Sequence, residues 1–98
     1  MTPRFIVRPH AEADVAEAFD WYERRSPGLG MEFLRAVDVT FAIIVRTPHL
    51  FPQVEKTVRR ALLRRFPYSV FFVAQPDSIS VLAVMHAHRH PHRWLSRA

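Results

Sequence analysis

The second half of the chain concentrates the side chains that could contact or cleave a phosphate. Histidines occupy every second position near the C-terminus, at His86, His88, His90 and His92, and arginines precede and interrupt them. An imidazole with an unperturbed pKa of ~6.5 can exchange a proton near neutral pH. A guanidinium can hold a phosphate through two parallel hydrogen bonds. Phosphodiester cleavage needs a base, an acid and a cation, and the candidate catalytic residues for it are His86, His88 and Arg60.

The same cationic side chains could instead form a binding surface. Residues 57–98 hold seven arginines and a single acidic residue, whereas residues 1–56 hold seven basic and eight acidic side chains. This asymmetry suggests a polyanion or an acidic protein surface as the partner. A solvated, arginine-rich strand edge without a partner is the simpler alternative. The candidate target-binding residues are Arg59, Arg60, Arg64, Arg65, Arg89, Arg93 and Trp94. The indole of Trp94 could stack on a base or fold back onto the core.

The alternating histidines do not predict a metal site. Zinc requires ligands that converge tetrahedrally, and four histidines along one extended segment cannot converge unless the segment folds back. The chain has no cysteine that could complete such a site, which also excludes disulfides and thiolate chemistry. We therefore expect neither a metal nor another cofactor.

Three predicted strands position these side chains, over Val58–Leu63, Tyr68–Ala74 and Ile79–Ala87. Valine, isoleucine, leucine, phenylalanine and tyrosine dominate the last two strands, as a buried pleated surface requires. Gln75–Ser78 contains proline and aspartate and is typical of a turn. Apolar residues occupy both the odd and the even positions of these two strands. Both faces of the sheet are therefore apolar and must be covered by other parts of the protein.

The first half predicts one strand and two helices. A strand over Arg4–Arg8 ends at a proline, and an amphipathic helix follows over His10–Arg24. A second helix runs from Leu29 or Met31 to Thr47. Both glycines of the chain lie between the helices, so the short link predicts an antiparallel helical hairpin.

The element order β-α-α-β-β-β predicts an α+β fold. We expect a helical hairpin packed on one face of a mostly antiparallel sheet of four strands. A length of 98 residues corresponds to one domain over 1–98. No stretch approaches the ~20 apolar residues of a membrane span, and the N-terminus lacks a secretory pattern. We expect no membrane partner and a cytoplasmic location.

The second predicted helix carries apolar residues on more than one face. Val39 and Ile43 fall outside its main apolar stripe. An apolar surface that the fold does not cover indicates a protein partner. The basic half of the chain favours an acidic partner, which could dock as an amphipathic helix or as a strand added to a sheet edge.

Short motifs occur in order along nearly the whole chain. They are Pro9-His10-Ala11, Trp21-Tyr22-Glu23, Pro27-Gly28-Leu29-Gly30 with Phe33, Thr47-Pro48 with Phe51-Pro52, Arg59-Arg60 with Leu62, Phe66-Pro67-Tyr68, Val84-Met85-His86, and Arg89, Pro91, Trp94 and Arg97. In this order and spacing the chain resembles the RelE/ParE superfamily of type II toxins, which includes plasmid stabilisation proteins. The resemblance implies a cognate antitoxin that holds the toxin inactive in a hetero-oligomer.

The resemblance leaves two activities open. RelE-like members are ribosome-dependent mRNA endonucleases, whereas ParE-like members poison DNA gyrase and have no accepted nuclease site. The C-terminal tyrosine and the lysines of many nucleases are missing here, and Tyr68 belongs to a shared core motif; some relatives, however, use histidine with arginine and glutamate. The tail with His86, Arg89, Pro91 and Trp94 resembles ParE-like sequences. We therefore favour a non-enzymatic gyrase poison, with the mRNA endonuclease and a non-toxic antitoxin-binding module as alternatives.

Overall fold

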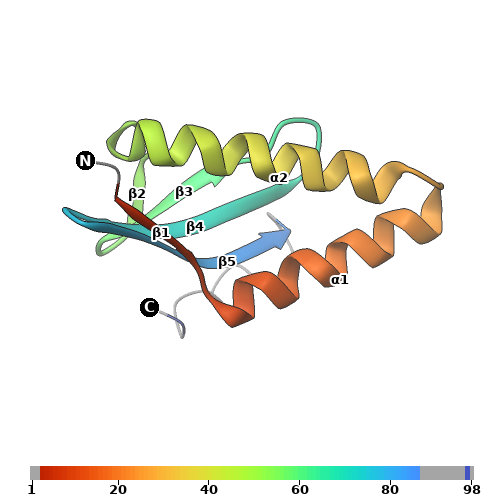
Figure 1. The fold of residues 1–98 in the computed structure, drawn as a ribbon, viewed down its shortest axis with the longest axis horizontal. Helices are drawn as coiled ribbons and strands as arrows, with labels where there is room; N and C mark the ends of the chain where they lie inside the picture. The colour runs from red at the N-terminus through yellow and green to blue at the C-terminus, as the bar shows by residue number, and fades with distance from the viewer. Residues whose placement is uncertain (1–2, 87–96, 98) are drawn as a thin grey trace.

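The computed structural model describes residues 3–86 and residue 97. The chain order is β1 (Arg4–Val7), α1 (Pro9–Arg25), α2 (Leu29–Arg46), the 3₁₀ turn η1 (Pro48–Leu50), β2 (Gln53–Glu55), β3 (Val58–Leu62), β4 (Tyr68–Gln75) and β5 (Ser78–His86). The helices form an antiparallel hairpin that packs on one face of a single sheet (Figure 1). The predicted α+β fold is confirmed.

The sheet has five strands rather than the four expected. Its order is β1-β5-β4-β3-β2, with β1 parallel to β5 and the other neighbours antiparallel. The unexpected strand, β2, is three residues long and joins β3 through a turn in which Lys56 has φ 50°. Tight hairpin turns of this kind usually carry glycine or asparagine, so no hairpin signal is present in the sequence at this point.

The link between the helices depends on Glu23 and two glycines. The Glu23 carboxylate accepts hydrogen bonds of 2.9 Å from the backbone N–H groups of Gly28 and Gly30. It thereby satisfies free donors at the N-terminus of α2 and places negative charge at the positive end of the helix dipole. Gly28 has φ +92°, and a Cβ on Gly30 would lie 2.8 Å from the Phe19 ring. The two glycines therefore permit the turn and the close approach of α1 to α2.

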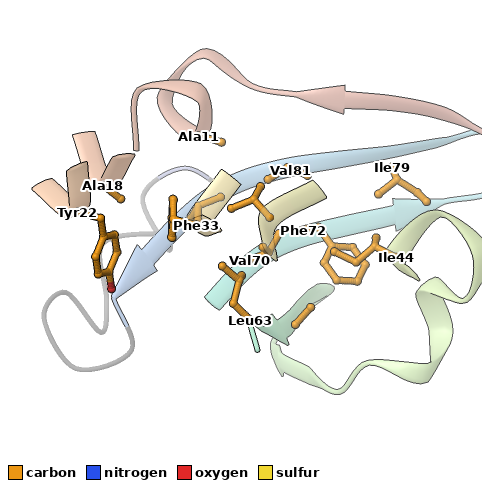
Figure 2. Close-up of a cluster of buried hydrophobic side chains, with 13 residues drawn as sticks. Ala11, Ala18, Tyr22, Phe33, Ile44, Leu63, Val70, Phe72, Ile79 and Val81 are labelled. Atoms are coloured by element: carbon orange, nitrogen blue, oxygen red, sulfur yellow. The ribbon is translucent and has the colours of Figure 1, made fainter. Parts of the chain in front are cut away.

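The main core lies between the hairpin and the sheet (Figure 2). Phe33 from α2 and Phe72 from β4 are both 0% exposed. At the end of the core near the hairpin link, the Tyr22 ring contacts the rings of Phe33, Phe66 and Tyr68 at centroid distances of 5.0–6.0 Å. These aromatic contacts join both helices to β4 and to the loop before it.

A β-bulge in β5 changes which face its last residues occupy. Phe71 of β4 pairs with Ala83, but Phe72 pairs with Val81, so Leu82 is the extra residue. Before the bulge, Val81 belongs to the core under the helices, and after it Ala83 faces the opposite side. The bulge consequently turns His86, the last residue of β5, toward the helix face.

Beyond the end of β1, two charged side chains form hydrogen bonds with the outer edge of β5. The N–H of Arg8 donates to the oxygen of Val81 at 3.1 Å, which is the last backbone contact along this edge in the described residues. The Asp14 carboxylate of α1 then accepts from the Val84 N–H at 3.0 Å and from the Arg97 guanidinium at 2.7 Å. The same guanidinium lies 3.2 Å from the Leu82 oxygen. Side chains thus satisfy the backbone groups that a longer β1 would have paired.

The second helix is amphipathic but not membrane-spanning. It buries Phe33, Val37 and Ile44 and exposes other apolar side chains. No helix within residues 3–86 has both the length and the apolarity required to cross a bilayer.

Candidate functional site

Two exposed aliphatic side chains mark one face of α2. Val39 is 54% exposed and Ile43 is 44% exposed. They lie one helical turn apart, so their side chains are neighbours on the same face. The prediction that α2 leaves apolar surface uncovered therefore agrees with the structure.

These two residues line a groove of about 860 Å³ between α2 and the β3 side of the sheet, which we call the α2–β3 groove. Leu62, at the end of β3, lines the same groove and is 64% exposed. The charged side chains that line it are Glu32, Arg35, Arg64 and Arg65. The α2–β3 groove therefore combines an apolar surface with a net positive rim.

A second and smaller groove, of about 440 Å³, lies between α1 and α2. Its charged lining residues are Glu12 and Asp38. Because its charge is opposite to that of the α2–β3 groove, the two grooves would select partners of opposite charge.

The loop after β3 brings two of the predicted target-binding arginines to the α2–β3 groove. Arg64 and Arg65 are both exposed, and Arg65 has φ +70°. A non-glycine residue in this left-handed region is uncommon and is held there by its surroundings. Sequence reasoning placed these arginines near a sheet edge, but it did not place them beside Val39 and Ile43.

The other two predicted arginines of β3 point to opposite faces of the sheet. Arg60 is exposed and pairs with Phe71, on the face away from the helices. Arg59 points to the helix side, where its guanidinium donates to the backbone oxygen of Phe51. Arg59 thus fastens the segment before β2 onto β3, whereas the Arg60 side chain makes no hydrogen bond within the part of the chain that the structure describes.

The structure separates the described members of the proposed catalytic group. The ring of His86 lies against the Tyr68 ring, with centroids 5.5 Å apart, on the helix face. Arg60 lies on the other face and two strands away. These two side chains therefore cannot contact the same phosphate in this conformation. His88 lies outside the described residues, as do Arg89, Arg93 and Trp94.

The described residues contain no group of three or more histidine, cysteine, aspartate or glutamate side chains suited to hold a metal ion. The histidines at positions 88, 90 and 92 lie outside this part of the chain.

Sequence reasoning missed Leu62, Arg35 and the pair of Asp14 with Arg97. Leu62 resembles any apolar strand residue, although it is 64% exposed in the structure. Arg35 resembles a solvated helix residue. The contact between Asp14 and Arg97 joins positions 83 residues apart, and the resemblance to a known family included Arg97 without indicating its partner.

Comparisons with known proteins identify a family from the sequence and support the fold from a solved structure. Residues 5–91 match the family described as the ParE toxin of the type II toxin-antitoxin system, parDE. A solved structure described as the chromosomal ParDE TA system from P. aeruginosa aligns with a TM-score of 0.79 at 18% sequence identity, covering 89% of this chain and 98% of that chain. This alignment supports the fold. No curated protein sequence shows significant similarity. Because the family match covers most of the sequence, the chain belongs to the ParE toxin family of type II toxin–antitoxin systems.

Proposed function

We propose that this chain is the toxin of a type II toxin–antitoxin pair and that it stops growth by poisoning DNA gyrase. The observation that carries the proposal is the family match over residues 5–91. The placement of Arg60 and His86 on opposite faces of the sheet supports it, because a nuclease needs its proton-transfer group and its cation at one phosphate.

The proposed target surface consists of exposed arginines. Arg60, Arg64 and Arg65 are exposed, and their side chains make no hydrogen bond or ion pair within the described residues. Arg89, Arg93 and Trp94 extend the proposed surface into the tail. Arg59 contributes indirectly, because its guanidinium fixes the segment before β2.

The proposed binding site for the antitoxin is the α2–β3 groove. Val39 and Ile43 supply exposed apolar area, and Arg35, Arg64 and Arg65 supply positive charge around it. An acidic segment with apolar side chains matches both properties. The groove between α1 and α2 matches such a segment less well, because Glu12 and Asp38 would repel it. We infer that toxin and antitoxin form a hetero-oligomer through the α2–β3 groove.

Induction of the chain in bacterial cells tests the proposed target. A gyrase poison produces double-strand breaks, the SOS response and filamentation while messenger RNA stays intact. We expect a small gene beside this one to encode the antitoxin, and its co-expression should restore growth. Rapid cleavage of mRNA at codon-related positions on ribosomes would instead establish the endonuclease alternative, and normal growth at full expression would establish a non-toxic antitoxin-binding module. Arg60→Ala should abolish growth inhibition in the same assay. Its matched control is Arg4→Ala, since both arginines are exposed strand residues and Arg4 lies in the strand at the opposite edge of the sheet from β2.

A further inference from the structure

The outer edge of β3 is only partly covered by β2. Strand β2 pairs with Val58 and Arg59, while β3 continues to Leu62. The N–H of Arg60 donates to the oxygen of Pro52 at 3.1 Å. Proline has no N–H that could donate to the Arg60 oxygen in exchange, so the hydrogen-bonded pairing of β2 with β3 ends at Pro52.

The free backbone groups that remain can be identified from the ladder. The N–H of Leu63 donates to Tyr68 on β4 at 2.9 Å, and the N–H of Arg60 points the other way, to Pro52. In an antiparallel pair the hydrogen-bonding direction alternates along the strand. The oxygen of Arg60 and both the N–H and the oxygen of Leu62 therefore face outward, next to the α2–β3 groove that Leu62 lines.

The opposite edge of the sheet offers no comparable row in the described part of the chain. Strand β1 covers β5 as far as Val81. Beyond it, the Asp14 carboxylate accepts from the Val84 N–H, and the Arg97 guanidinium donates to the Leu82 oxygen. An added strand would have to displace these side chains.

The outward groups at Arg60 and Leu62 also constrain what can fill the groove. Any segment that covers Val39, Ile43 and Leu62 takes these backbone groups out of water. An N–H or carbonyl buried without a partner weakens binding by roughly 5- to 150-fold. The backbone of a helix is paired internally, so a helix could reach these groups only through its side chains, as Asp14 does at the opposite edge. An extended segment pairs them with its own backbone.

We propose that the antitoxin inserts an extended, acidic segment that pairs with β3 at Arg60 and Leu62 as an additional strand. This strand would cover the part of the β3 edge that lies beyond Pro52, where the pairing with β2 stops. The inference rests on the proposed antitoxin partner and specifies how it binds. Alternate side chains of this segment enter the groove against Val39 and Ile43. Its carboxylates pair with the arginines of the rim, Arg35, Arg64 and Arg65.

Amide hydrogen exchange resolved by NMR tests this mode directly. The toxin is compared alone and in complex with the co-expressed product of the adjacent small gene. In the free toxin the Leu62 amide should exchange fast and the Ala61 amide slowly, because the Ala61 N–H faces β4. In the complex the Leu62 amide should slow by at least roughly 10-fold while Ala61 stays unchanged.

Two variants at one position provide an independent check. Leu62→Pro removes the outward N–H without breaking a hydrogen bond of the fold, and proline is tolerated on edge strands. Leu62→Ala removes the same side-chain contacts but keeps the N–H. Leu62→Pro should bind the antitoxin about 2- to 10-fold more weakly than Leu62→Ala. Equal affinities of two folded variants would contradict strand addition.

The outcomes separate the binding mode from the proposed function. If the complex forms and covers Val39 and Ile43 while the Leu62 amide still exchanges fast, the partner docks as a helix and strand addition is wrong. If the adjacent product does not bind at all, the proposed antitoxin pairing and the strand mode both fail. If Leu62→Pro does not fold, exchange in the unaltered protein decides.

Discussion

Replacing Asp14 tests whether one carboxylate substitutes for the missing length of β1. Asp14 accepts from the Val84 N–H at 3.0 Å and from the Arg97 guanidinium at 2.7 Å. The side chains of Asp14 and Arg97 are only 18% and 16% exposed. Asp14→Ala therefore leaves the Val84 N–H and the Arg97 guanidinium without their acceptor and poorly solvated. Both losses act on β5, which pairs with β1 on one side and β4 on the other.

The expected loss of stability follows from these two contacts. A buried N–H left without an acceptor costs about 1–3 kcal/mol. Losing the partly buried ion pair adds about 1 kcal/mol, which is the upper end of the range for ion pairs that remain partly accessible to solvent. Asp14→Ala should thus lower the free energy of unfolding by about 2–4 kcal/mol, out of a total of about 5–15 kcal/mol for a domain of this size. The melting temperature should fall by roughly 10–25 °C.

Urea and thermal unfolding measure this loss, with Glu17→Ala as the control, because Glu17 is exposed on the same helix. Asp14→Asn keeps one acceptor oxygen and should lose about half as much stability as Asp14→Ala. A double-mutant cycle with Arg97→Ala should give a coupling energy of about 0.5–3 kcal/mol. If the free energy of unfolding of Asp14→Ala lies within ~0.5 kcal/mol of that of the Glu17→Ala control, Asp14 does not close this edge of the sheet.

Three further predictions concern the exposed arginine, the helical link and the groove. Arg60→Ala should abolish growth inhibition and change stability by no more than ~0.5 kcal/mol, whereas the core control Phe33→Ala should cost about 3–5 kcal/mol; a large loss of stability in Arg60→Ala would show a structural role. Gly30→Ala places a Cβ 2.8 Å from an aromatic ring and should cost about 1–3 kcal/mol in urea unfolding; an unchanged midpoint would mean that the helices separate easily. Val39→Glu and Ile43→Glu should each weaken antitoxin binding in calorimetry while the toxin stays folded, and the affinity of the unaltered pair should fall as salt screens its charges; variants that simply unfold would show that these side chains belong to the core.

The regular elements were predictable because their signals are local. Helical periodicity, the glycines between the helices and the β-rich runs from Tyr68 onward specify the hairpin and the central strands within windows of a few residues. Strict alternation along β4 places Tyr68, Val70 and Phe72 on one face and Phe71 and Val73 on the other, which agrees with the two buried clusters.

The features that sequence reasoning missed arise from contacts between distant residues. Strand β2 forms because Gln53 and Glu55 find partners on β3, and its turn residue Lys56 carries no glycine signal. Because of the bulge at Leu82, His86 lies on the opposite face of the sheet from the one that strict alternation from Ile79 would give. Alternation could not reveal it, because a bulge depends on the pairing register with β4.

The candidate site was predicted in parts but not as a whole. The exposed face of Val39 and Ile43 and the arginines at 64 and 65 were singled out for separate roles. Their meeting in one groove depends on where the loop after β3 folds relative to α2, which neither segment encodes alone. The antitoxin and target surfaces assigned from the sequence are consequently adjacent.

We propose that this chain poisons gyrase and that its antitoxin reverses the effect. The most direct measurement incubates the purified toxin with DNA gyrase, ATP and supercoiled plasmid, and quantifies linear DNA after the proteins are denatured. We expect linear DNA that increases with toxin concentration, is absent for Arg60→Ala and disappears when the product of the adjacent gene is added. Gyrase activity unaffected by the toxin, together with mRNA cleavage by the same preparation on translating ribosomes, would contradict it.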